Sequence, residues 1–111
     1  MSNVEFEYKE EIQTIELDGE KYVIPQRTAE LEKKLREHND KVFDMTEYEG
    51  NIEILEILFG KKNVKKMFPD KENTMLDKLA KFTKCAMALF MKQYNKINAM
   101  SHDEILGMSA K

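Results

Sequence analysis

The chain has 111 residues, 41% of them hydrophobic and 35% charged, with a net charge of −3 and a single cysteine. This composition favours one globular domain with a small core and a heavily charged surface, and it excludes an intramolecular disulfide. No apolar run approaches the roughly 20 residues that span a bilayer, and no apolar leader follows Met1, so we expect no membrane segment and an intracellular location.

The first residues of the chain alternate between apolar and charged types. Val4, Phe6 and Tyr8 occupy every second position, with charged side chains between them. Because successive side chains of a strand point to opposite faces, this alternation predicts a strand with one apolar face.

A second alternation follows and is interrupted by Asp18-Gly19. This dipeptide favours a two-residue type I′ turn, because both positions need a positive φ. We therefore predict a β-hairpin over about residues 12–25, in which Ile15 faces Tyr22 and the apolar side chains share one side.

Three helices are predicted between the hairpin and the last long apolar segment. Thr28 opens the first, which carries a narrow apolar stripe, and a capping box of Thr46 and Glu49 opens the second. The second helix is apolar nearly all round, so we expect it to be buried. The third is short and rich in lysine, and it stops before Pro69. The predicted bounds are about residues 28–45, 47–59 and 62–68.

The last predicted helix, residues 74–98, is the one around which the others should pack. Neither proline nor glycine interrupts it, and its apolar face is wide. We expect a capping box of Thr74 and Asp77 at its start. Cys85 falls on the apolar side, which favours a buried thiol over a reactive one.

These elements define a mostly α (α+β) fold, with an N-terminal β-hairpin followed by three to four helices packed around a long central helix. Residues 1–98 form a single domain in this interpretation. Residues 99–111 form a tail that either adds one helical turn or frays.

Signatures of catalysis and of metal binding are missing from the sequence. The four glycines are scattered singly, and His38, Cys85 and His102 are far apart with no ligand spacing between them. We therefore expect no enzymatic activity, no metal and no cofactor. His38 lies on the apolar stripe of the first helix, where it is either a ligand or titrating switch or, as we favour, a packed or half-exposed histidine.

Four lysines cluster on the short third helix, and such a cluster can neutralise phosphates. They are Lys61, Lys62, Lys65 and Lys66. The chain is acidic overall and lacks the interleaved aromatic residues that readers of RNA and single strands use, so nucleic acid is disfavoured as a partner. A solvated basic face or a protein-docking patch is the favoured interpretation.

Methionines gather on or just after the last helix, where flexible thioethers either fill gaps in the core or line a surface that binds helical partners. Core packing is the default interpretation. Where they are exposed, four residues of this helix become the predicted partner-binding surface, namely Met87, Met91, Tyr94 and Ile97.

Charge is unevenly divided along the chain. Residues 1–60 carry 16 acidic and 7 basic side chains, a net charge of −9, whereas residues 61–111 carry 5 acidic and 11 basic ones, a net charge of +6. The two halves can attract each other within one subunit, or between copies arranged head to tail as a homo-oligomer. The alternative is a solvated surface on which acidic and basic side chains are separated by chance.

Over roughly residues 12–98 the chain resembles the small tail assembly chaperones of long-tailed, siphovirus-like bacteriophages and prophages of Gram-positive bacteria. The resemblance lies in the order, length and character of four segments. These are the hairpin IELDGEKYVIP, the charged helix RTAELEKKLREHNDKV, the apolar and lysine-rich stretch NIEILEILFGKKNVKKMFPD, and the closing helix LDKLAKFTKCAMALFMKQYNK.

The resemblance implies a non-enzymatic protein of the host cytoplasm that is made during phage assembly and is absent from the finished virion. Such chaperones are thought to coat the helix-rich tape measure protein and to recruit tail tube subunits around it. The resemblance transfers no site residues. A small nucleic-acid-binding regulator that uses the lysine cluster is the alternative from another class, and a toxin–antitoxin or anti-repressor partner is a third.

Overall fold

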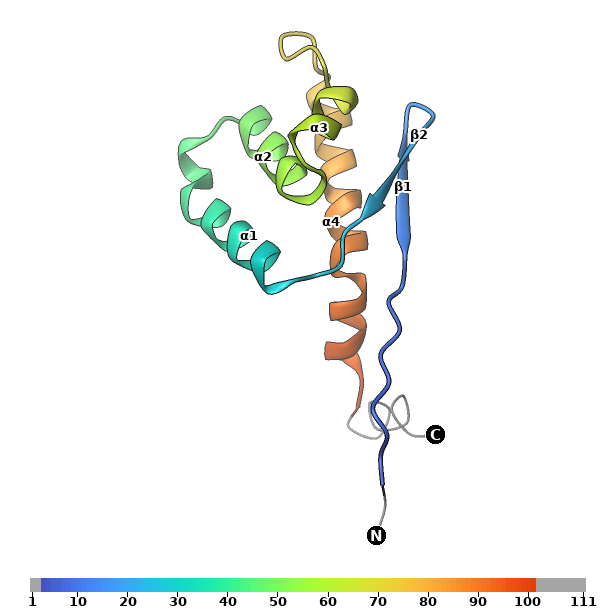
Figure 1. Cartoon of the computed structure of the whole chain (residues 1–111). Coiled ribbons are helices and arrows are strands. Elements are labelled where there is room, and N and C mark those ends of the chain that lie inside the picture. Colours follow the sequence, from blue (N-terminus) through green and yellow to red (C-terminus); the bar gives the residue numbers. More distant parts are fainter. Residues whose placement is uncertain (1–2, 102–111) are drawn as a thin grey trace.

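The computed structural model describes residues 3–101 and shows an antiparallel hairpin followed by four α-helices (Figure 1). The fold class predicted from the sequence is therefore confirmed. The elements are β1 (Gln13–Leu17), β2 (Glu20–Ile24), α1 (Ala29–Lys41), the 3₁₀ turn η1 (Val42–Asp44), α2 (Glu47–Phe59), α3 (Lys61–Met67) and α4 (Leu76–Ala99).

The hairpin has the predicted turn and register. Asp18 and Gly19 have φ values of 50° and 85°, so both central residues adopt the positive φ that a type I′ turn needs. Ile15 pairs with Tyr22, and both are buried on the side that meets the helices. The short-range turn signal thus places the apolar face of the hairpin correctly against the core.

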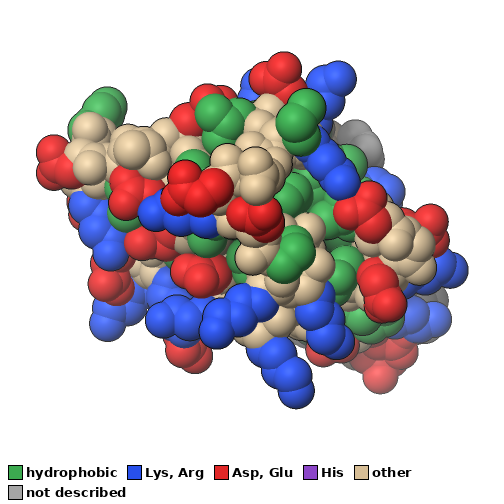
Figure 2. Space-filling view, turned by 90° about the horizontal axis from the view of Figure 1, so that it is seen from above, with side chains coloured by type: hydrophobic (Ala, Val, Ile, Leu, Met, Phe, Trp, Pro, Cys, Tyr) green, Lys and Arg blue, Asp and Glu red, His purple; other side chains and the backbone are tan. Residues whose placement is uncertain are grey.

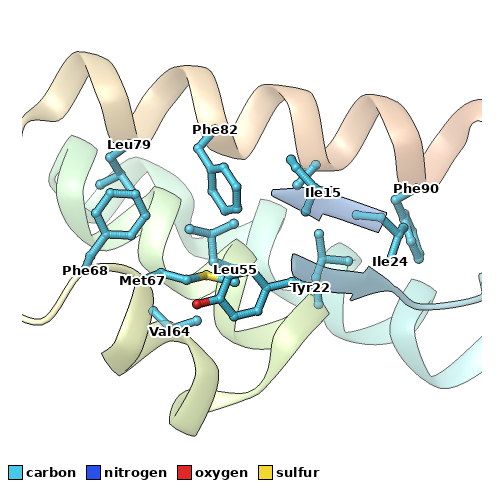
Figure 3. Packing of buried hydrophobic residues seen from close by; sticks show 12 residues of the cluster. Ile15, Tyr22, Ile24, Leu55, Val64, Met67, Phe68, Leu79, Phe82 and Phe90 are labelled. Atoms are coloured by element: carbon cyan, nitrogen blue, oxygen red, sulfur yellow. The ribbon is translucent and has the colours of Figure 1, made fainter. Parts of the chain in front are cut away.

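Helix α4 runs lengthwise past the hairpin and past α1 to α3 (Figure 1), and the hairpin also contacts α2 directly. The α4 side chains Leu79, Phe82 and Phe90 are buried and point toward the strands, α2 and α3 (Figure 3). On the opposite side of this cluster lie Leu55 of α2 and Met67 of α3, also buried. The last helix is therefore the long helix of the fold and supplies much of the core, whereas α1 and α3 pack mainly on α2.

An aromatic chain links the elements across the core. The ring of Phe59 in α2 lies edge-on to Tyr22 of β2, with centroids 6.1 Å apart. Phe82 of α4 is 6.4 Å from Phe59 and 6.1 Å from Phe68, which follows α3. Such offset and edge-to-face pairs add a favourable term beyond the area they bury, so the hairpin, α2 and α4 are fixed to one another.

The caps of the first two helices are those that the sequence predicts. The backbone N–H of Leu31 donates to Thr28 Oγ1 at 3.2 Å. At α2, the Glu49 N–H donates to Thr46 Oγ1 and the Thr46 N–H donates to the Glu49 carboxylate, at 3.1 and 2.9 Å. These hydrogen bonds from Thr46 favour the charged form of the carboxylate and lower the pKa of Glu49.

The cap predicted for the last helix is wrong. Helix α4 begins at Leu76, after an N-cap at Met75 that makes no side-chain hydrogen bond. The Thr74 hydroxyl instead donates to the backbone carbonyl of Asp70 at 2.6 Å, closing the preceding turn. Threonine and aspartate serve turns as readily as caps, and here the turn takes the threonine.

The strand predicted around Val4, Phe6 and Tyr8 is also wrong. Residues 3–12 precede β1 without strand pairing, and all three side chains are exposed. The sheet of the described chain has only the strands β1 and β2. Alternation creates an apolar face, but a strand also needs a neighbour to pair with, and this segment has none there.

Three smaller predictions need correction. The first helix loses its α geometry after Lys41 and continues as η1, short of the predicted end at residue 45. Helix α2 is only half-buried, because Leu55 and Leu58 are its only buried large side chains. Cys85 is exposed, since the apolar face of α4 is narrower than its composition indicates. The predicted tail beyond residue 101 lies outside the described residues.

The surface is heavily charged, as expected from composition. Figure 2 looks onto one end of the molecule and shows lysine, arginine and acidic side chains interleaved, with hydrophobic side chains visible between them. Within residues 3–101, no helix is long and apolar enough to cross a membrane.

Candidate partner-binding groove

A groove of about 310 Å³ lies between α1 and α4 and is here called the α1/α4 groove. Helix α4 contributes Met87, Phe90, Met91 and Tyr94, whose spacing of three and four residues places them along one side of the helix. Leu35 of α1 is the facing apolar residue. The polar residues of the lining are Arg27, Glu32, Arg36 and Asn39.

The two methionines in this groove are half-buried, so their flexible thioethers are neither sealed in the core nor free in solvent. Tyr94 is 36% exposed, and the guanidinium of Arg27 lies 3.9 Å from the centroid of its ring. This cation–π contact orients the tyrosine as one wall of the groove. Met87, Met91 and Tyr94, three of the four predicted partner-binding residues, therefore share one site.

The fourth residue, Ile97, lies elsewhere. It lines a neighbouring hollow of about 480 Å³ between the end of α4 and the segment that precedes β1. Arg27, Phe90 and Tyr94 line both hollows, so they form the partition between them. Ile97 is thus close to the groove but outside it.

The charge at the groove edge is mainly positive. Arg27 and Arg36 flank it, and Glu32 is the acidic residue of the lining, at 3.5 Å from Arg36. Exposed pairs of this kind contribute little stability. The edge therefore favours a partner that carries acidic side chains beside an apolar stripe.

The lysine cluster forms a separate surface. Lys61, Lys62, Lys65 and Lys66 are all exposed on α3, while Val64 and Met67 are buried on its other side. The four lysines therefore form one basic face directed away from the core and take no part in the α1/α4 groove.

His38 is packed, as the favoured interpretation expects. Its side chain is 2% exposed, and its Nδ1 lies 2.7 Å from Oε1 of Glu53 in α2. The other carboxylate oxygen of Glu53 lies 3.6 Å from Nζ of Lys41. This contact joins α1 to α2. No local pattern indicates Glu53 as the partner of His38, because the two residues lie on different helices.

The groove suits noncovalent binding of an apolar stripe, since its α4 side is thioether and aromatic and Leu35 adds an aliphatic side chain, beside the polar residues named above. In the part of the chain that the structure describes, no three His, Cys, Asp or Glu residues gather as metal ligands. Sequence reasoning found the α4 side of the groove but missed Leu35 and Arg27, because nothing local indicates that they face α4. Comparisons with protein-family models, with curated proteins and with solved structures gave no match for this chain.

Proposed function

We propose that this protein is a non-enzymatic assembly chaperone that holds an amphipathic helix of its partner in the α1/α4 groove. The observation that carries the proposal is that Met87 and Met91 pack against the edge of the core while remaining half-exposed in an open groove. Following the resemblance of its segments, the partner is the phage tape measure protein, around which the chaperone helps to recruit tail tube subunits in the host cytoplasm.

A helical partner fits the groove better than an extended one. Two helices form its walls, and an amphipathic helix can lay its apolar face between them by side chains spaced three and four residues apart. Methionine adapts its shape to different apolar side chains, which suits a long partner with many similar but unequal sites. The arginines at the edge select helices with acidic flanks.

Replacing Met91 by aspartate should weaken binding of a helical tape measure segment by about tenfold or more, because a carboxylate is then buried without a partner in the complex. The control is Met75→Asp, which makes the same change at the N-cap of the same helix, where the side chain is 70% exposed and outside the groove. Titration calorimetry with tape measure peptides that carry an apolar stripe measures both. Equal affinities for the two variants would contradict the proposal.

The exposed lysine cluster of α3 supports a second candidate function. This is a small nucleic-acid-binding regulator that uses Lys61, Lys62, Lys65 and Lys66. Phosphate contacts make such binding steeply dependent on salt. Salt-sensitive binding to DNA or RNA that is lost in Lys65→Glu/Lys66→Glu, with no binding of helical peptides, would favour this alternative.

A further inference from the structure

An aromatic side chain projects from the corner between α1 and α2. Phe43 in η1 is 94% exposed, and its neighbours Asp40 and Asp44 are exposed as well. We name these three residues the Phe43 knob. A large ring held this far out of the core, beside two carboxylates, suits insertion against an apolar and basic surface.

Such a surface runs along α4. Advancing by 100° per residue, the helix places Lys81, Lys84, Ala88 and Lys92 on the side opposite the buried Leu79. All four are exposed, and together they are named the lysine face. Ala88 is small, so it leaves a shallow space between the aliphatic parts of the lysines around it.

The charges of both surfaces have no ion-pair partner within the described residues. One ion pair there joins the acidic first half of the chain to the basic second half: Nζ of Lys78 lies 2.9 Å from the carboxylate of Asp18. Neither aspartate of the knob takes part in a pair, and neither does any lysine of the face. Their opposite charges are therefore available to a second molecule.

We propose that the Phe43 knob of one copy docks on the lysine face of a second copy. The ring of Phe43 covers Ala88 and the stems of the flanking lysines, where it also gains cation–π attraction. Asp40 and Asp44 meet the ammonium groups. The partner is a second copy because this chain carries both complementary surfaces, with opposite charge.

The knob and the face are different surfaces of one subunit, so the contact is heterologous and leaves each copy with one free knob and one free face. Copies therefore add head to tail. Neither surface belongs to the lining of the α1/α4 groove, so association does not occupy the proposed partner site. The proposal stands independently of the identity of that partner.

A charge exchange tests the contact. Asp40→Lys/Asp44→Lys gives a basic knob, and Lys84→Glu/Lys92→Glu gives an acidic face. In sedimentation velocity at low salt, the wild type should associate as its concentration rises. Each variant alone should remain monomeric, and an equimolar mixture should associate again, because opposite charges then meet at every contact. The control Lys65→Glu/Lys66→Glu, which reverses two exposed lysines of α3, should associate as the wild type does.

Phe43→Ala provides a second test that does not alter charge or the core, since the ring is almost fully exposed. It should weaken association by about tenfold, as loss of a central aromatic contact does. A wild type that stays monomeric at all concentrations would overturn the proposal. The proposal would also be overturned if the charge variants associated like the wild type, or if their mixture stayed monomeric. The same holds if the Lys65→Glu/Lys66→Glu control lost association as the other variants do.

Discussion

Replacing Leu79 by alanine is expected to lower the free energy of unfolding by about 2–5 kcal/mol. Leu79 is 0% exposed and belongs to the cluster in which α4 meets the hairpin, α2 and α3. The substitution removes buried methyl groups and leaves a cavity that neighbours such as Leu55 and Phe82 fill only in part. For a domain of this size that loss is a large share of the total stability.

The matched control is Leu76→Ala, the same change three residues earlier on α4, where the side chain is 42% exposed. It should cost less than about 1 kcal/mol, because surface substitutions away from special features change stability little. Urea unfolding followed by circular dichroism measures both variants. If the two cost the same, α4 does not supply the core contacts described above.

Removing the His38 side chain is expected to cost about 1–3 kcal/mol, since it breaks a partly buried hydrogen bond and leaves Glu53 with a less complete set of partners. The stability lost on removing His38 should be smaller when Glu53 has already been replaced. In a double-mutant cycle of His38→Ala and Glu53→Ala, we expect a coupling energy of about 0.5–3 kcal/mol.

Lys41 allows the contribution of the two Glu53 contacts to be separated. It reaches the same carboxylate at 3.6 Å but is exposed, so Lys41→Ala should change stability by less than about 1 kcal/mol. Thermal or urea unfolding of the single and double variants gives the stability loss of each and the coupling energy between them. Additive losses for His38 and Glu53 would show that their contact does not join α1 to α2 energetically.

Features encoded by a few neighbouring residues were predictable from the sequence. Asp18-Gly19 fixes the hairpin turn through its positive φ values, and Thr46 with Glu49 forms the capping box of α2. In both cases the interacting groups lie within four residues of one another, so no distant part of the chain can change the outcome.

Features in which two local hydrogen bonds compete, or that depend on distant packing, were not predictable from the sequence. Thr74 has the same local pattern as a capping residue, yet it hydrogen-bonds within the preceding turn. Phe6 sits in a regular alternation, yet the described chain supplies no strand beside it. The groove follows the same rule: Met87 and Met91 are visible as a stripe on one helix, but the position of Leu35 opposite them depends on how α1 packs.

The central claim is that the α1/α4 groove receives the partner helix, and methyl NMR tests it most directly. The chain has eight methionines, whose methyl groups can be labelled and assigned by substitution. On titration with a helical tape measure segment, the signals of Met87 and Met91 should shift together, while that of Met75, which lies outside the groove, should not. A partner that binds while both groove signals stay unchanged would contradict the claim.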